Sequence, residues 1–467
     1  MIFNSVAFLV FYAIFFYVYW WINNAGTVKW RNGILIIASY IFYGWWDWRF
    51  LILIAFSSAA DFILGQKIHQ AQSLSAKKTF LIASLAINLG ILGFFKYFNF
   101  FIHSAEILLS SFSIPLDPFT LQIILPVGIS FYTFQTMSYS IDIYRNQISP
   151  TKSWLQFFAF VSFFPQLVAG PIERAQRFLP QFETKKVFDP ANATAGLRLI
   201  LWGFFKKIVI ADNLSILVDQ VFRDPETHSG LGIMLGSVAF AFQIYCDFSG
   251  YSDIAIGLGK TMGFDLMTNF KKPYFSASFK EFWGRWHISL SIWFRDYVYI
   301  PVGGNRLNRA RTDLNLLITF LLSGLWHGAN YTFIIWGFMH GSILILEKRV
   351  RFLQNIGWVP VFIITSLFWI PFRAEDTTHF FELLNNLCSL NLNTTWIKAY
   401  FGLKLYSLIT LFLVFLLVEW KSKHQNFGQW VQSFSGYIRM AIYFALAFAI
   451  LLLGNFNVKP SFIYFQF

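Results

Sequence analysis

The sequence predicts an all-α polytopic membrane protein, and its composition and its long apolar runs are the two observations behind that prediction. Of the 467 residues, 56% are hydrophobic and 13% are charged, and the mean hydropathy is +0.54. Soluble domains are less apolar and more highly charged. A helix satisfies its own backbone hydrogen bonds in lipid, and about 20 apolar residues cross the hydrocarbon core, so each long run is expected to be an embedded helix.

The apolar runs are distributed over the whole chain. They lie at 2–22, 33–64, 80–102, 119–138, 196–212, 231–249, 313–346, 357–372, 405–419 and 437–455. The runs at 33–64 and 313–346 are long enough for a helical hairpin each, so we expect roughly 10 to 13 membrane-embedded helices. The first run has no basic residue before it and no small-residue cleavage site after it, and we expect it to stay as a helix rather than to be removed as a signal.

The excess of positive charge has a topological explanation. The chain carries 36 Lys and Arg against 23 Asp and Glu, a net charge of +13. In a soluble protein this excess would suggest nucleic acid, but in a membrane protein basic residues gather in cytoplasmic loops, so no nucleic-acid partner is expected. Basic residues follow the first two runs, whereas the loop at 103–118 has two acidic residues and no Lys or Arg. This pattern places the amino terminus outside, and Lys421 and Lys423 before the last run direct the carboxyl terminus outward.

The densest basic stretch covers 271–311 and contains four candidate donor-binding residues, Lys271, Lys272, Arg285 and Arg295. As an amphipathic cytoplasmic segment it would lie on anionic membrane lipids. As a basic mouth it would receive a phosphorylated donor, such as a coenzyme or the phosphopantetheine of a carrier protein. We favour the basic mouth, and membrane lipids are expected partners of the helices in either case.

Three of the eight histidines fall in apolar surroundings: His287 in GRWHISLS, His327 in LSGLWHGAN and His340 in GFMHG. Ionisable residues in membrane runs are costly to bury and are functional candidates, although a structural role remains an open alternative for each. Gly328, next to His327, permits the close approach of a ligand. His287 stands beside the basic stretch and supplies a second polar centre, so His327 and His287 are the candidate catalytic pair.

Several other chemistries lack their motifs in this sequence. It contains no H-E-x-x-H and no Cys or His cluster with zinc spacing, so no metal is expected. Cys246 and Cys388 lie far apart and indicate no disulfide framework. GLGKT at 257–261 resembles a phosphate loop, but Ile254 stands where that pattern needs its first glycine. Because no G-x-S-x-G elbow occurs, a serine hydrolase within this chain is not expected.

Two further stretches leave their roles open. YCDFSGYSD at 245–253 places Asp247 and Asp253 at the end of an apolar run, where such residues either join helices through hydrogen bonds or take part in catalysis. The chain ends in FIYFQF at 462–467, with Tyr464 as the single hydroxyl. Termini are usually polar and frayed. The apolar ending therefore either packs against the helices or has a chemical role.

Six stretches carry a resemblance to a known family. They are IASYIFYGWWDWRF (37–50), LPVGISFYTFQTMSYSIDIYR (125–145), FPQLVAGPIER (164–174), QIYCDFSGYSDIAIG (243–257), NFKKPYFSASFKEFWGRWHISLSIWFRDYVYIPVGGNR (269–306) and LSGLWHGANYTFIIWGFMHG (322–341). In this order they resemble the membrane-bound O-acyltransferase (MBOAT) family. The likeness is greatest to its bacterial branch of alginate O-acetylation proteins, which acylate cell-envelope polymers.

The resemblance implies a fold and a set of site residues. Residues 1–455 would form a single transmembrane domain, in which a ring of helices surrounds a thin centre with a cytoplasmic funnel. Residues 456–467 would form a C-terminal acyl-transfer tail. The resemblance makes His327, in the W-H-G motif, the catalytic histidine and matches His287 to the family's W-H-I-S-L-S histidine. It also implies that Tyr464, in an F-x-Y-F-x-F ending, holds the acyl group transiently.

These inferences predict an O-acyltransferase of the bacterial cytoplasmic (inner) membrane. It would take an acetyl group from a cytoplasmic acyl thioester, acetyl-coenzyme A, and pass it through a tyrosyl ester to a periplasmic transferase of the SGNH type. The final acceptor would be an exported polysaccharide, either alginate-like or peptidoglycan. Two alternatives stay open: direct acylation of a lipid or glycan without a tyrosyl intermediate, and a transporter whose buried histidines relay protons.

Overall fold

The computed structural model describes residues 1–114, 120–168, 170–223, 228–388, 404–456 and 463. All regular elements in these ranges are helices, which confirms the predicted fold class. The chain packs as two compact units, one made of residues 1–193 and 259–267 and the other of 194–258 and 268–467. The expected division into a single domain, 1–455, and a tail, 456–467, remains a prediction, because most of the tail lies outside the described residues.

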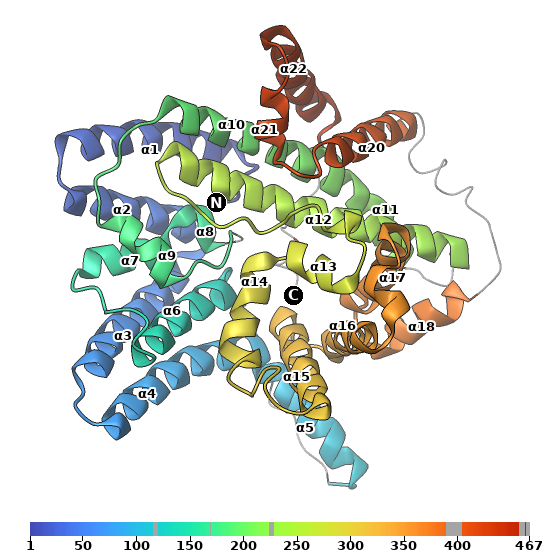
Figure 1. Cartoon of the computed structure of the whole chain (residues 1–467), viewed down its shortest axis with the longest axis horizontal. Coiled ribbons are helices and arrows are strands. Elements are labelled where there is room, and N and C mark those ends of the chain that lie inside the picture. The colour runs from blue at the N-terminus through green and yellow to red at the C-terminus, as the bar shows by residue number, and fades with distance from the viewer. Residues whose placement is uncertain (115–119, 169, 224–227, 389–403, 457–462, 464–467) are drawn as a thin grey trace. The chain divides into compact units, whose positions relative to one another are not determined.

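The first unit contains the amino-terminal helices. They are α1 (Val6–Ala25), α2 (Val28–Asp47), η1 (Trp48–Phe50), α3 (Leu51–Gln70), α4 (Leu74–Leu92), η2 (Gly93–Tyr97), α5 (Phe98–Ser111), α6 (Ile129–Tyr144), α7 (Trp154–Ser162), α8 (Phe164–Leu167), α9 (Ala175–Phe178) and η3 (Leu179–Phe182). Helices α3, α4 and α6 lie side by side (Figure 1). Between them the buried Asp61 accepts hydrogen bonds from Ser84 at 2.5 Å and Asn88 at 2.7 Å, so polar side chains join these helices.

The second unit contains the remaining helices, except for the ends of two of them. They are α10 (Pro190–Phe204), η4 (Phe205–Ala211), α11 (Asp212–Arg223), α12 (Gly230–Thr261), η6 (Pro273–Phe275), α13 (Phe279–Arg285), α14 (Ile288–Phe294), η7 (Arg295–Tyr299), α15 (Arg309–His327), α16 (Tyr331–Arg349), η8 (Arg351–Asn355), α17 (Trp358–Arg373), α18 (Thr377–Leu387), α20 (Lys404–Lys421), α21 (Phe427–Gln432) and α22 (Gly436–Leu453). The first residues of α10 and the last residues of α12 fall in the first unit. Helices α15 and α16 form the hairpin expected at 313–346 (Figure 1).

Glycines allow close packing between helices of the second unit. A Cβ atom on Gly324 of α15 would lie 2.1 Å from the carbonyl oxygen of Phe333, and one on Gly337 of α16 would lie 2.3 Å from that of Phe320. Close backbone approach through small residues is the usual packing of helices in membranes. His327 is the last residue of α15. The close packing of α15 on α16 therefore fixes the position of its imidazole relative to α16.

Two predicted runs have different limits in the structure. The run expected at 119–138 becomes a helix only at Ile129, because Gly128, with φ of 76°, precedes it in a left-handed conformation that favours glycine. The run expected at 231–249 continues to Thr261 in α12. YCDFSGYSD therefore lies inside this helix rather than at its end.

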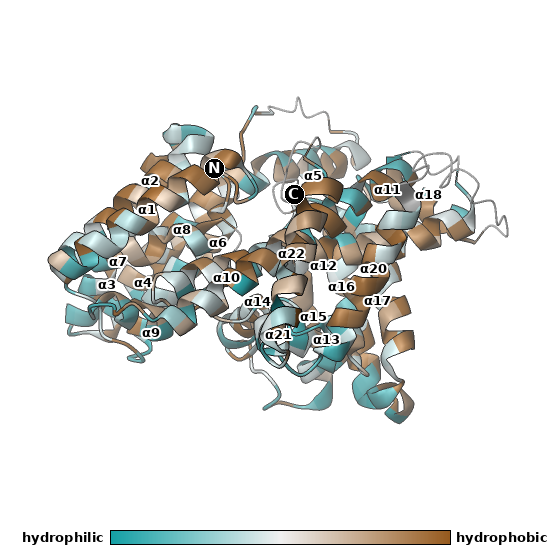
Figure 2. Cartoon of the chain, turned by 90° about the horizontal axis from the view of Figure 1, so that it is seen from above, coloured by the Kyte–Doolittle hydropathy of each residue, from teal (hydrophilic) through white to brown (hydrophobic). Residues whose placement is uncertain are grey.

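The length and composition of the helices confirm a multi-pass membrane protein. Five continuous helical stretches of the described chain are long and apolar enough to cross a bilayer: Val6–Ala25, Val28–Gln70, Leu74–Ser111, Gly230–Thr261 and Gly436–Leu453. Figure 2 shows hydrophobic residues over most of α1, α17 and α20. Large apolar side chains of α22 are exposed, among them Phe444 and Leu451, as expected for surfaces that contact lipid.

Candidate functional site

His327 lies at the carboxyl end of α15 and is 3% exposed. Three aromatic rings contact its imidazole: Trp326 at 4.9 Å, Trp336 of α16 at 5.1 Å and Phe372 of α17 at 5.3 Å between centroids. The helix ends here because the next residue, Gly328, is extended. The local sequence therefore places an ionisable group at the end of a helix and encloses it in aromatic side chains.

His287 lies beside His327, at the residue that precedes α14, and it is fully buried. The two imidazole centroids are 6.4 Å apart, and Phe248 of α12 packs on His287 at 4.6 Å. Its φ of 41° is left-handed, a conformation that costs free energy in a residue with a Cβ and often marks functional sites. The structure thus brings the two predicted histidines together from segments 40 residues apart in sequence.

His340 of α16 occupies a neighbouring aromatic box. Its ring is 4.9 Å from Trp336 and 5.1 Å from Trp283. Within the described part of the chain neither of its ring nitrogens has a hydrogen-bond partner. Trp336 therefore separates His340 from His327, and the enclosed pair consists of His287 and His327.

The four predicted donor-binding residues lie in three different environments. Lys271 and Lys272 line a polar cavity of about 290 Å³. Arg295 lines a separate apolar cavity of about 300 Å³ and pairs with Asp296 at 2.7 Å. Arg285 pairs with Glu281 at 2.5 Å and is not among the residues lining either cavity. The sequence indicated the basic segment, but its spacing could not show that the segment folds back on itself.

The polar cavity lies between η4, α12, the 268–272 segment, α20 and α21, and it carries charges of both signs. Besides Lys271 and Lys272, its charged and titratable lining residues are Lys206, Tyr245, Asp253, Glu419, Lys423 and His424. Among the described residues no carboxylate pairs with Lys271 or Lys423, and both side chains are exposed. The cavity therefore offers two accessible cations to an anionic ligand.

Lys272 is held at the wall of the polar cavity. Its ammonium donates hydrogen bonds to the carbonyl and hydroxyl oxygens of Ser422 and to the carbonyl oxygen of Gln425. Burial lowers the pKa of Lys272 to about 8, an effect that Glu419 opposes. Lys272 therefore ties the end of α20 to the segment before η6 and adds a positive charge that titrates near neutral pH.

The polar cavity adjoins the histidine pair through one aromatic residue. Phe270 lines the cavity, and its ring stacks 6.3 Å from that of His287 and 5.1 Å from that of Trp286. A ligand in the cavity thus lies one aromatic layer away from His287.

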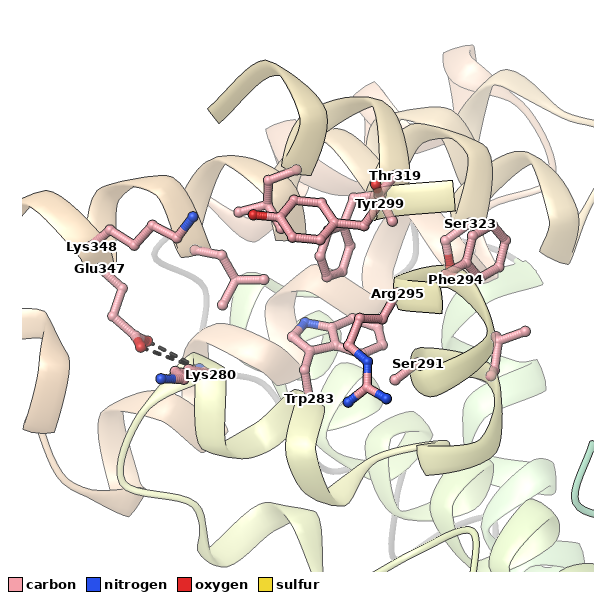
Figure 3. A pocket seen from close by; sticks show the side chains of 14 residues that line it. Lys280, Trp283, Ser291, Phe294, Arg295, Tyr299, Thr319, Ser323, Glu347 and Lys348 are labelled. Atoms are coloured by element: carbon pink, nitrogen blue, oxygen red, sulfur yellow. Dashed lines mark hydrogen bonds between the residues drawn. The ribbon is translucent and has the colours of Figure 1, made fainter. Parts of the chain in front are cut away.

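The apolar cavity lies between α13, α14, η7, α15 and α16, and Figure 3 shows its lining side chains. Ser323 of α15 lies one helical turn before His327, and Trp283 of α13 contacts His340 at 5.1 Å. Glu347 of α16 accepts backbone N–H groups of Phe279 at 2.6 Å and Lys280 at 3.2 Å (Figure 3). This carboxylate holds the amino-terminal end of α13 in place.

Sequence reasoning missed two lysines of the second unit. Lys206 pairs with Asp253 at 2.7 Å, and Lys207 pairs with Asp212 and Asp247, each at 2.7 Å. The polar residues of YCDFSGYSD therefore meet partners from the apolar run at 196–212. Two adjacent lysines inside a membrane run were the available signal, because such residues need partners when buried.

Tyr464, the predicted acyl carrier, lies outside the described residues. Its neighbour Ile463 is described and is 3% exposed. The Ile463 side chain belongs to the hydrophobic cluster that also contains Trp336 and Phe372, the rings that contact His327.

Comparisons with known proteins define the class of this helical membrane protein. The model of the membrane-bound O-acyltransferase family matches residues 5–370. The chain is 42% identical over 386 residues to the probable alginate O-acetylase AlgI of Pseudomonas aeruginosa, covering 80% of this chain and 72% of that protein. It is 36% identical to the peptidoglycan O-acetyltransferase of Helicobacter pylori, covering 76% and 73%. It is 29% identical to the teichoic acid D-alanyltransferase of Streptococcus thermophilus, covering 53% and 63%.

The chain belongs to the membrane-bound O-acyltransferase family. It is an enzyme that transfers acyl groups to hydroxyls. The predicted family and enzyme class are thereby confirmed.

Proposed function

We propose that this enzyme moves acetyl groups across the bacterial cytoplasmic membrane for the O-acetylation of an exported cell-envelope polysaccharide, either alginate-like or peptidoglycan. The names of its relatives support a polymer of the cell envelope as the final acceptor. The observation that carries the proposal is the enclosed pair of His287 and His327, whose rings lie 6.4 Å apart, in a member of an acyltransferase family. The family assignment also removes the reason to invoke a transporter.

Acetyl-coenzyme A, the proposed donor, binds in the polar cavity. Its phosphates need accessible cations, and Lys271 and Lys423 supply them there. The apolar cavity also has cations in its lining, Lys280 and Lys348 beside the paired Arg295. However, within the described part of the chain none of its lining residues is in ring contact with His287, whereas Phe270 of the polar cavity is. From the polar cavity the thioester end extends past Phe270 toward His287. Arg285, which is paired with Glu281, supports the segment rather than the ligand.

His327 acts as the general base on the hydroxyl of Tyr464. A phenol with a pKa near about 10 is a weak nucleophile at neutral pH, so it needs a base during attack. The phenol oxygen bonds to the acetyl carbon, the carbon–sulfur bond breaks, and His327 passes the phenol proton to the departing thiolate. His287 positions the thioester and donates a hydrogen bond to the developing oxyanion. The products are an acetyl ester on Tyr464 and free coenzyme A.

The tyrosyl ester then meets its acceptor on the outer side of the membrane. Tyr464 lies 11 residues after Leu453, a distance of up to about 36 Å when the chain is extended, which exceeds the hydrocarbon thickness of about 30 Å. A separate periplasmic transferase of the SGNH type takes the acetyl group from Tyr464 and places it on a sugar hydroxyl. Coenzyme A stays on the cytoplasmic side.

Replacement of Tyr464 by phenylalanine tests the tyrosyl step against direct acylation. In membrane vesicles given labelled acetyl-coenzyme A, the purified periplasmic transferase and a polysaccharide, we expect Tyr464→Phe to lose transfer to the polymer by at least about 100-fold, because no oxygen accepts the acetyl group. The matched control adds Phe465→Tyr to the same variant. It restores a hydroxyl one residue away and so tests whether the hydroxyl must be at position 464. Native-level transfer by Tyr464→Phe would instead support direct acylation.

A further inference from the structure

Asp247 of α12 lies in a buried ion cluster that the proposed reaction does not use. The ammonium of Lys207 is 2.7 Å from the Oδ1 atoms of both Asp247 and Asp212. All three side chains are at most 8% exposed. Burying one cation with two carboxylates leaves excess negative charge, which is costly unless further donors reach the carboxylates.

The further donor to Asp247 comes from the carboxyl-terminal end of the chain. The backbone N–H of Ile463 donates to Asp247 Oδ2 at 2.7 Å, across 216 residues of sequence. A hydrogen bond to an ionised acceptor is roughly twice as strong as a neutral one. The Ile463 side chain is itself buried, so a polar and an apolar contact act on the same residue.

The same cluster also holds the chain just after α22. The Asn455 side-chain amide donates to the carbonyl oxygen of Asp212 at 3.1 Å, and its backbone N–H donates to that of Ile208 at 3.2 Å. The Asn213 amide donates to the carbonyl oxygen of Leu453 at 2.9 Å. Residues of η4 and α11 thus bind the start of the carboxyl-terminal segment, and Asp247 binds it at Ile463.

We propose that Asp247 is a positioning residue, held by Lys207, that seats the carboxyl-terminal segment through the N–H of Ile463 and so presents the next residue, Tyr464, for acylation. The hydrogen bonds of Ile463, Asn455 and Asn213 support the binding of this segment. Only its consequence for acylation rests on the proposed function. The alternative is that the cluster merely joins η4, α11 and α12, with Ile463 as an incidental neighbour.

Limited digestion of the full-length protein with carboxypeptidase, in detergent, tests the seating without reference to chemistry. In a Tyr464→Phe background, which takes no acetyl group, we expect Asp247→Asn to raise the rate of tail digestion on the order of tenfold, because a neutral amide binds the Ile463 N–H more weakly. The matched control is Asp253→Asn, which removes a carboxylate from the neighbouring pair with Lys206 and should leave tail digestion unchanged. Equal digestion rates in Asp247→Asn and its parent would overturn the proposal.

A second pair of variants leaves the ion cluster untouched. Ile463→Pro removes the N–H donor, whereas Ile463→Val keeps the donor and most of the apolar side chain. The readout is release of the last three residues, 465–467, because carboxypeptidases stall near proline. We expect faster release of these residues with Ile463→Pro and a native rate with Ile463→Val. If both are digested at the native rate, Ile463 is not seated by its N–H and the proposal is wrong, even where Asp247→Asn fails to fold.

The consequence for acylation has a separate readout. With Tyr464 present, Asp247→Asn should slow acetylation of Tyr464 on the order of tenfold, leave the KM for acetyl-coenzyme A unchanged and keep the native pH profile, since neither the donor cavity nor His327 is altered. If native Tyr464 carries no acetyl group, the proposed function is wrong. The digestion results would still test whether Asp247 binds the carboxyl-terminal segment. Native-rate acetylation by Asp247→Asn would reject the positioning role alone.

Discussion

At the scale of single residues, His287 combines burial, a left-handed backbone and contact with a second histidine. A left-handed residue with a Cβ persists only where its surroundings hold it in place, and asparagine tolerates that conformation better than most residues. Its ring centroid lies 6.4 Å from that of His327. A fixed backbone would suit the role proposed for His287, the donation of a hydrogen bond to an oxyanion.

We expect His287→Ala to lower kcat for acetyl transfer by about 10²- to 10³-fold, because the oxyanion loses a donor. His287→Asn keeps an N–H donor and accepts the left-handed backbone, so it should retain more activity than His287→Ala. Steady-state release of coenzyme A measures both. His340→Phe is the control: it fills the adjoining aromatic box with an apolar ring and should stay within about threefold of native, as expected for a packing change away from the reacting atoms. A loss in His340→Phe as large as in His287→Ala would contradict the assignment of His287.

The affinity for the donor should depend on pH through Lys272. Because burial lowers the pKa of Lys272 to about 8, its ammonium is present below that pH and is lost as pH rises through it. The positive charge at the cavity wall then disappears, and the tie to Ser422 and Gln425 weakens. We expect the KM for acetyl-coenzyme A to rise several-fold between about pH 7 and 9. Lys272→Met should show a raised KM that is flat over this range, whereas a flat KM in the native enzyme would argue against the role of Lys272.

The sequence predicted part of the site at this scale. His287 and His327 were recognisable because ionisable residues stood in apolar surroundings. The sequence did not show that Arg285 and Arg295 lie apart from Lys271 and Lys272. Their separation depends on where the short helices turn between residues 273 and 299. The Lys207 cluster was missed because its partners, Asp212 and Asp247, come from different helices.

At the scale of elements, the π-helical segment η4 directs two adjacent lysines to different partners. Lys206 bonds Ser249 at 2.8 Å and Asp253, whereas Lys207 bonds Asp212 and Asp247. π-helical turns are rare and often lie at functional sites. The apolar run predicted at 196–212 indicated a helix here, but hydrophobicity carries no signal for its π-helical turn.

Helix packing provides a second prediction at this scale. Gly324→Ala would bring a Cβ atom to 2.1 Å from the backbone oxygen of Phe333, so α15 and α16 must move apart. We expect a loss of stability of about 1 to 3 kcal/mol and a clear fall in kcat, because His327 lies on the same helix end. Gly284→Ala on α13 is the control, since a Cβ there meets no atom within 4 Å. Thermal unfolding in detergent and coenzyme A release measure both effects, and native behaviour of Gly324→Ala would show that the hairpin does not depend on this close approach.

At the scale of the whole molecule, composition and apolar runs sufficed for the all-helical, multi-pass fold. Burial in lipid imposes one rule on every segment, namely internal backbone hydrogen bonding, so runs of apolar residues report helices directly. The ends of helices were less predictable. Ile129 begins α6 because of the left-handed Gly128, and short helices such as α21 are set by caps, here a reciprocal pair of bonds between Asn426 and Gln429.

The membrane also gives a reason for the proposed carrier residue. A cytoplasmic thioester carries phosphates that do not cross hydrocarbon, whereas an acetyl ester on a phenol is small and uncharged. The proposed topology, with the carboxyl terminus outside, lets Tyr464 receive the acetyl group in the protein interior and release it outward. Ile463, the residue before Tyr464, is buried, which is compatible with this proposal.

The central claim is that the acetyl group passes from the thioester to Tyr464 with His327 as the base. Its most direct test is mass spectrometry of the carboxyl-terminal peptide after the enzyme has been supplied with isotopically labelled acetyl-coenzyme A. We predict label on Tyr464 in the native enzyme and a decrease of about 10²- to 10⁴-fold in its rate of formation in His327→Ala, the range that a general base contributes. Equal labelling of Tyr464 in both proteins, or no label on native Tyr464 during active transfer, would contradict the claim.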